Sequence, residues 1–172
     1  MAADTTTSRA PDARFLLSHP AHFIALGFGS GLAPKAPGTF GTLAALALFW
    51  FMHLALAMPP FVVAFAAVPL FALGLWASEV TARDLGVEDH GSIVIDEMAA
   101  FLPLAALASA SLVLQLIAFG LFRLFDIWKP PPIGYFEKRL KGGMGVMFDD
   151  VVAAGYAYVI LIVVIVVQHK FF

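Results

Sequence analysis

The stretch Met98–Leu121, MAAFLPLAALASASLVLQLIAFGL, decides on which face of a membrane the segments before and after it lie. It is long enough to cross a bilayer once, because a helical span needs about 20 residues. If it crosses once, the segments before and after it lie on opposite faces of the membrane. If it folds back at Ser109-Ala110-Ser111, both segments share one face, so this choice fixes where the polar segments lie.

The distribution of charge favours the fold-back. With a hairpin, nine of the ten Lys and Arg residues and all 12 acidic residues fall on one face, and only Lys170 lies opposite. A single span would place five of those basic residues outside, against the positive-inside rule. Ser109 or Ser111 can cap the second helix, and Pro103 weakens a long uninterrupted one. We therefore predict a hairpin whose short first arm needs neighbouring helices to cover it.

Composition supports a membrane location for the whole chain. Of its 172 residues, 61% are hydrophobic and 13% are charged, whereas soluble proteins have about 25% charged residues. The mean hydropathy is +0.90. The chain has no cysteine, which excludes disulfides, thiolate nucleophiles and cysteine-based metal sites. No basic run suggests binding to nucleic acid.

The predicted fold is an all-α integral membrane protein with about five membrane helices, one of them a short re-entrant or hairpin arm. Its N-terminus and active-site loops are expected on the cytoplasmic face. Residues 1–14 are predicted to be a disordered tail, and residues 15–172 a single membrane-embedded domain. A short interfacial helix is expected over Phe15–Phe28. The apolar stretches behind these predictions are Thr42–Met58, Pro60–Ala77, Met98–Leu121 and Val151–Val167.

Two short motifs place ionisable residues beside apolar helices. In SIVIDEMAAF, Asp96 and Glu97 stand at the mouth of a helix, where the helix dipole favours acids but where an ionised pair near the headgroups needs a counter-ion. In FRLFDIWKP, Arg123, Asp126 and Lys129 recur every three residues, so they follow roughly one helix face until the triple proline ends the helix. An interfacial helix end with snorkelling basic residues is the alternative interpretation.

A third motif, KGGMGVMFDDVVAAG, combines glycines with a pair of acids. Gly142, Gly143 and Gly145 form a predicted loop that leads into a helix opening at Asp149 and Asp150. Glycines let successive N–H groups turn toward an anion. One of the two aspartates is expected to be a plain N-cap, and the sequence leaves open which one.

A fourth motif, GFGSGLAPKAPGTFGTLAAL, is a second Gly- and Pro-rich loop that feeds a helix. Gly29 and Ser30 lie in the loop, with Thr39 and Thr42 at the predicted helix start. Helix N-termini of this kind bind anions, although no Gly-Lys-Ser/Thr follows and the loop is not a Walker motif. Simple capping by Thr42 is the alternative.

These parts together suit one kind of chemistry. Carboxylates select Mg²⁺, a hard cation that is often shared with substrate phosphate. Basic groups and exposed amides hold phosphate oxygens. The pattern therefore predicts hydrolysis of a phosphate ester whose tails lie in the bilayer.

At these residues the chain resembles the phosphatidylglycerophosphatase A family of bacterial inner membranes. The matching stretches are GFGSGLAPKAPGTFGTLAA, IVIDE, FRLFDIWKPPPIGYFEK and GGMGVMFDDVVAAG, in the family's order between Gly27 and about Gly155. The resemblance implies Mg²⁺-dependent removal of the terminal phosphate of phosphatidylglycerophosphate, giving phosphatidylglycerol and phosphate. It also implies a multi-pass protein of the inner membrane whose site faces the cytoplasm. The motif residues that carry over are Asp96, Glu97, Asp126, Lys129, Asp149 and Asp150.

Individual roles within the motifs are our hypothesis. Lys129 and the amides of residues 142–145 are expected to neutralise the transferred phosphoryl group. Attack by water and attack by an aspartate nucleophile both remain open. The residues expected to hold Mg²⁺ are Asp96, Glu97, Asp126 and Asp149. The residues expected to bind the substrate are Gly29, Ser30, Thr39, Thr42, Arg123, Gly142, Gly143 and Gly145.

Rival interpretations fit the sequence less well. The Pro-Ser-Gly-His stretch of type-2 phosphatidic acid phosphatases is absent, and DDVVAAG does not supply the spaced aspartates of CDP-alcohol phosphotransferases. A small transporter or channel is the main alternative, since intramembrane acids can line an ion path. The acids cluster toward one face, however, which leaves a path through the membrane incomplete. The oligomeric state cannot be predicted.

Overall fold

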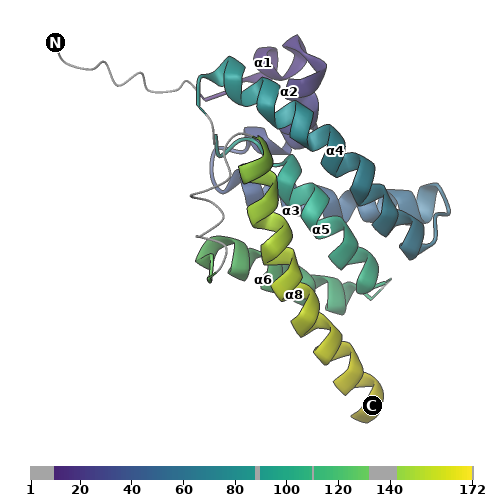
Figure 1. Cartoon of the computed structure of the whole chain (residues 1–172). Coiled ribbons are helices and arrows are strands. Elements are labelled where there is room, and N and C mark those ends of the chain that lie inside the picture. The colour runs from purple at the N-terminus through teal and green to yellow at the C-terminus, as the bar shows by residue number, and fades with distance from the viewer. Residues whose placement is uncertain (1–9, 88–89, 110, 132–142, 172) are drawn as a thin grey trace.

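The computed structural model describes residues 10–87, 90–109, 111–131 and 143–171, and within these ranges every regular element is a helix. The helices pack into one bundle (Figure 1). This confirms the all-α prediction. In chain order the elements are α1 (Ala13–Ser18), α2 (Pro20–Ala25), the 3₁₀ segment η1 (Gly27–Leu32), α3 (Pro37–Trp50), the π-helical turn η2 (Phe51–Ala55), α4 (Pro60–Leu85), α5 (Ile95–Leu107), α6 (Leu112–Trp128) and α8 (Gly143–Phe171).

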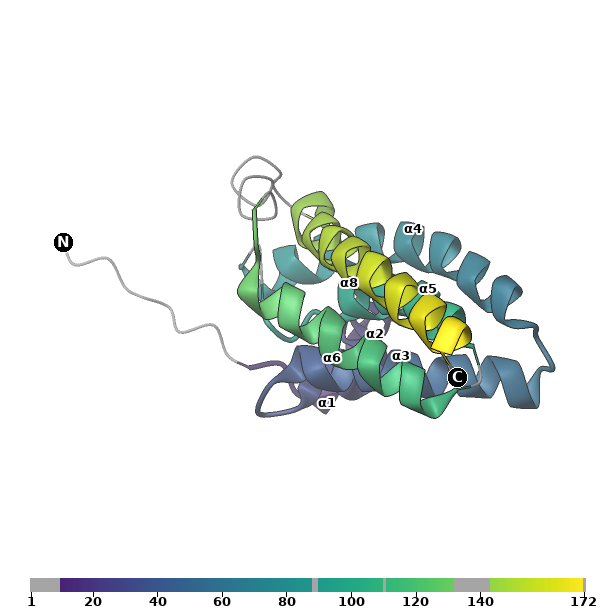
Figure 2. The same ribbon diagram turned by 90° about the horizontal axis from the view of Figure 1, so that it is seen from below.

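Helix α5 is the centre of the bundle. It contacts α3, α4, α6 and α8, and in the view from below it lies among them (Figure 2). Ten of its 13 residues are buried, as expected of a helix that is apolar on all sides. The short arm of the predicted hairpin is thus covered by its neighbours.

The predicted hairpin is confirmed at the level of the chain path. Helix α5 ends at Leu107 and α6 begins at Leu112, with Ser111 as N-cap accepting a hydrogen bond from the Leu114 N–H at 3.4 Å. Phe101 packs against Phe122 near the middle of the pair. Arg123, toward the end of α6, lies 3.5 Å from Glu97 at the start of α5, so α5 and α6 run antiparallel. Of the two serines proposed as caps, Ser111 takes the role.

Within the described ranges, three helical segments are long and apolar enough to cross a membrane: Pro37–Ala55, Pro60–Leu85 and Met147–Phe171. Their outward faces carry large apolar side chains such as Phe65 and Val159, which suit lipid contact. The protein is therefore a membrane protein. Helices α5 and α6, at 13 and 17 residues, are shorter, so the count of five membrane helices remains a prediction.

Several helix boundaries differ from the predicted ones. Helix α4 continues past the apolar stretch that ends at Ala77 and includes a more polar segment up to Leu85. It ends there because Gly86 adopts a left-handed conformation (φ 71°). The interfacial helix expected over Phe15–Phe28 is two short helices, because the extended His19 (φ −150°) separates them. Helix α3 begins at Pro37, before the predicted start at Thr42.

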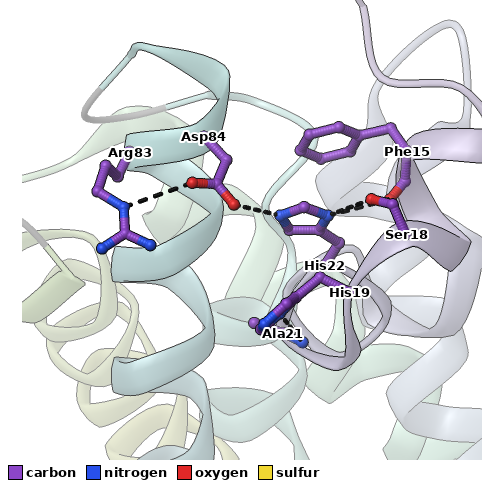
Figure 3. A network of polar contacts seen from close by, with 7 residues as sticks. All are labelled: Phe15, Ser18, His19, Ala21, His22, Arg83 and Asp84. Atoms are coloured by element: carbon purple, nitrogen blue, oxygen red, sulfur yellow. Dashed lines mark hydrogen bonds and ion pairs between the residues drawn. The ribbon is translucent and has the colours of Figure 1, made fainter.

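A buried histidine fastens the N-terminal helices to the end of α4 (Figure 3). His22 is only 4% exposed, and its Nε2 lies 2.9 Å from Asp84 Oδ2. Its Nδ1 lies 3.0 Å from both Ser18 Oγ and the Phe15 carbonyl, and the Phe15 ring stacks on the imidazole. The network holds α1 and α2 in place.

A second buried hydrogen-bond network, centred on Gln115, holds the hairpin turn. Its removal is expected to destabilise the fold. Gln115 is fully buried; it accepts from Trp50 Nε1 at 2.9 Å and donates to the Ser109 carbonyl at 2.8 Å. Replacing Gln115 with leucine leaves these groups unpaired, so the free energy of unfolding should fall by about 1–3 kcal/mol.

Thermal unfolding in detergent micelles measures this effect. Gln168→Leu is the matched control because Gln168 lies exposed near the end of α8. If both variants unfold at the wild-type temperature, Gln115 does not hold the turn.

Candidate active site

Three carboxylates from two helices meet at one end of the bundle. Asp96 and Glu97 lie in the first turn of α5, and Asp150 lies in α8. One oxygen of each lies within 4.8 Å of the others. Asp96 is 7% exposed and Asp150 is 5% exposed. These three residues are called the acid triad below.

The acid triad has the character of a cation site. Three carboxylates at this spacing, two of them buried and that of Glu97 partly buried, repel one another unless protons or a cation neutralise them. Glu97 Oε2 is buried and has no hydrogen-bond partner within the described part of the chain. Asp96 Oδ1 accepts the Glu97 backbone N–H at 3.0 Å. An all-oxygen donor set with a spare buried oxygen fits Mg²⁺.

An arginine and an aspartate from α6 border the triad. Arg123 Nη1 lies 2.6 Å from Asp126 Oδ2 and 3.5 Å from Glu97 Oε1. Asp126 also lies close enough to Asp150 for the two carboxylates to interact electrostatically. The Nε of Arg123 is buried and has no acceptor among the described residues. Asp126, expected from the sequence among the metal ligands, therefore lies beside the triad as the partner of Arg123.

The two adjacent aspartates of α8 have different surroundings. Successive residues of a helix point about 100° apart, so Asp149 and Asp150 face different neighbours. Asp149 Oδ2 lies 3.3 Å from Lys129 Nζ, while Asp150 joins the triad. The sequence predicts Asp149 as a metal ligand, whereas in the structure Asp150 is the aspartate of α8 that joins Asp96 and Glu97.

Neither aspartate caps the helix. Helix α8 begins at Gly143, so both lie in its second turn and the predicted helix start at Asp149-Asp150 is wrong. Gly143 and Gly145 are part of this helix rather than a preceding loop, and Gly142 lies outside the described residues.

The other glycine-rich motif packs its backbone against the start of α5. A Cβ on Gly38 would lie 2.0 Å from Glu97 Oε1 and 3.1 Å from Arg123 Nη1. One turn on, a Cβ on Gly41 would lie 2.7 Å from Val94 Cβ. Because these positions lack side chains, α3 approaches closely enough to form a wall of the acid triad.

Gly38 is not among the predicted site residues, because a Gly- and Pro-rich motif of this kind suggests exposed amides that bind an anion. The usable signal was the spacing of Gly38 and Gly41, which places both on one face of a helix. Gly29 is predicted to bind the substrate, but a Cβ built on it would meet Leu16 Cδ2 at 3.5 Å and no other described atom within 4 Å.

The predicted hydroxyl residues lie in the same motif with local partners. Thr42 is buried in α3 and donates to the Gly38 carbonyl at 2.9 Å, so it is not a cap; the N-cap position is Ala36. Ser30 Oγ donates to the Gly27 carbonyl at 2.8 Å. Thr39, in the first turn of α3, is half-buried. Thr42 thus fixes the backbone of the glycine that lies against Glu97.

Comparison with known proteins identifies relatives across nearly the whole chain. The family model for phosphatidylglycerophosphatase A matches residues 23–165. The chain is 46% identical to phosphatidylglycerophosphatase A of Haemophilus influenzae, over 95% of this chain and 98% of that protein. It is 42% identical to the Escherichia coli protein of the same name, over 86% and 87%.

A further relative carries a different name. A Bacteroides thetaiotaomicron protein, provisionally named as a phosphatidylinositol-3-phosphatase, is 39% identical over 81% of this chain and 90% of its own. All three names describe removal of a phosphate from a lipid headgroup. No solved structure matches the chain.

Proposed function

Because the chain belongs to the phosphatidylglycerophosphatase A family, we propose that it removes the terminal phosphate of phosphatidylglycerophosphate in a Mg²⁺-dependent reaction. The products are phosphatidylglycerol and inorganic phosphate. The chain is a lipid phosphatase, that is, a phosphoric monoester hydrolase. The transporter alternative is not favoured by these relatives.

The observation that carries the proposal is the acid triad beside Arg123. In our proposal Asp96, Glu97 and Asp150 hold Mg²⁺, and Asp126 completes the acidic wall. When bound, the ion polarises phosphoryl oxygens and stabilises the charge that develops on them. Glu97 supplies the oxygen that has no partner within the described residues.

In our proposal two basic residues bind the phosphate. Arg123 is held by Asp126 and Glu97, and its buried Nε has a donor to offer a phosphate oxygen. Fixed donors of this kind stabilise a transferring phosphoryl group without reorganising. Lys129 lies at the end of α6, paired with Asp149, and contributes a second positive charge at the rim.

The place of the site fits a lipid substrate. The triad lies at the start of α5 and near the start of α8, beside the end of α6, so it lies at one end of the bundle and near one end of the membrane-length helix α8. A phosphate headgroup reaches this level while its tails stay in the bilayer. By the positive-inside rule, we propose that this end faces the cytoplasm in a bacterial inner membrane.

Removing the metal tests the proposal. Purified protein in detergent micelles is expected to release phosphate from phosphatidylglycerophosphate with Mg²⁺, to lose at least about 99% of that rate in EDTA, and to regain it when Mg²⁺ is restored. Phosphatidic acid and phosphatidylinositol 3-phosphate, assayed in parallel, measure headgroup selectivity. A rate that is unchanged in EDTA would contradict the metal assignment.

A further inference from the structure

An apolar groove runs along the outside of the bundle between α4, α5 and α8. Its volume is about 460 Å³. Ala99 and Ala100 of α5 and Gly155 of α8 line it, and Val68 of α4 and Tyr158 of α8 also contribute. The groove is larger than a packing defect, since ligand pockets of proteins begin at about 300 Å³.

The groove lies close to the acid triad along α5 and α8. Ala99 and Ala100 follow Asp96 by three and four residues, which is one helical turn, and Ala154 follows Asp150 by four. From Val151 to Tyr158 the groove follows α8 for roughly 10 Å, at 1.5 Å per residue. The groove therefore lies about one helical turn beyond the carboxylates of α5 and α8 and extends toward the apolar part of both helices.

The walls of the groove decide what kind of molecule fits. Two of its three walls, α4 and α8, are membrane-length apolar helices, so the groove opens toward hydrocarbon. An occupant has to be apolar and elongated, and the triad one helical turn away calls for a phosphate at one end of it. A phospholipid acyl chain has this chemistry.

We propose that this groove binds one acyl chain of the phospholipid whose phosphate lies at the acid triad. The inference rests on the proposed function and extends it by assigning a tail site. An acyl chain gains little free energy by moving from bilayer hydrocarbon into an apolar groove. The groove therefore acts by orienting the lipid, so that the headgroup is delivered to Arg123 and the carboxylates in one pose.

The groove has open space beside Gly155, where any other residue would place a side chain. Gly155 lies in the middle of α8, is exposed, and a Cβ built on it meets no described atom within 4 Å. Glycine is a poor helix former, yet packing against the described neighbours does not require it here. Its missing side chain leaves room for the tail.

Filling the groove tests the proposal. Gly155→Leu places a side chain in the open space, and Gly120→Leu is the matched control, because Gly120 is also an exposed helical glycine with open space and does not line the groove. Both variants are expected to fold, since leucine is the better helix former. Each is assayed on long-chain phosphatidylglycerophosphate and on the same headgroup without acyl chains.

The groove predicts a selective loss. Gly155→Leu should lower kcat/KM for the long-chain lipid by about tenfold or more, because a small displacement of the reacting group has effects of this size. It should leave kcat/KM for the deacylated headgroup within about twofold of wild type, and Gly155→Ala should show a smaller loss. Gly120→Leu should change neither.

The contrary outcomes separate the two proposals. If wild type hydrolyses the lipid and Gly155→Leu does so equally well, the tail site is wrong and the phosphatase proposal stands. If Gly155→Leu instead changes the mass of the particle in light scattering, the groove is a contact between copies of the chain. If wild type releases phosphate from no lipid, both proposals fail.

Discussion

Replacing Asp150 with asparagine is expected to lower phosphate release from phosphatidylglycerophosphate by at least about 10³-fold, which corresponds to about 4 kcal/mol in the barrier. The reason is that Asp150 supplies one of the three clustered oxygens of the acid triad. An amide keeps the size of the side chain but removes the charge that holds a divalent cation. Phosphate release by purified protein at saturating Mg²⁺ measures the effect.

The neighbouring aspartate is the control. Asp149→Asn makes the same chemical change one residue away, where the carboxylate is paired with Lys129, and it should cost about tenfold. Without metal, Asp150→Asn should unfold at or above the wild-type temperature, because it removes one of three repelling charges. Added Mg²⁺ should stabilise wild type but not this variant. A severe loss in Asp149→Asn together with an active Asp150→Asn would reverse the two assignments.

Gly38→Ala is expected to reduce activity by about 10²-fold while the protein stays folded. The added methyl would lie 2.0 Å from Glu97 Oε1, so the Glu97 carboxylate has to move away from the triad. The moving atom is the end of a flexible side chain, so stability changes little. A displacement of about 1 Å at a reacting centre is enough for an effect of this size.

The matched control for this variant is Gly91→Ala. Gly91 lies in the segment before α5, and a Cβ there meets no described atom within 4 Å. Its activity should stay within about twofold of wild type. If Gly38→Ala is as active as Gly91→Ala and binds Mg²⁺ equally well, α3 does not shape the site.

The hairpin was predictable because several independent features agree on it. Ser111 is an ordinary N-cap, Pro103 disfavours one long helix, and the charge distribution selects the same fold-back. The burial of the short arm was not predictable in detail. Apolar residues around all of α5 show that it is covered, but they do not show that α3, α4, α6 and α8 all contact it.

The acids of the site were identified from their place beside apolar helices, yet their grouping depended on helix phase. The sequence predicts that α8 starts at Asp149, whereas the helix begins at Gly143. With the helix start misplaced, the sequence could not distinguish the aspartate that faces Glu97 from the one that faces Lys129. The exact start of a helix is hard to predict from polar residues, because an aspartate that caps a helix and an aspartate in its second turn look alike in the sequence.

The glycines illustrate a different limit. A glycine that binds an anion through its amide and a glycine that admits a neighbouring helix look alike in sequence. Gly38 and Gly41 belong to the second kind, since added Cβ atoms there would collide with Glu97 and Val94. Only the packing of α3 against the start of α5 reveals this.

The most direct test of the account is the binding of Mn²⁺, as a paramagnetic substitute for Mg²⁺, measured by electron paramagnetic resonance on purified wild type and Asp150→Asn. The account predicts one tight Mn²⁺ per wild-type chain, and affinity lower by at least about 10²-fold in the variant, since each carboxylate contributes charge to the site. Equal binding by both proteins, or no binding by an active wild type, would contradict the assignment of the acid triad as the metal site.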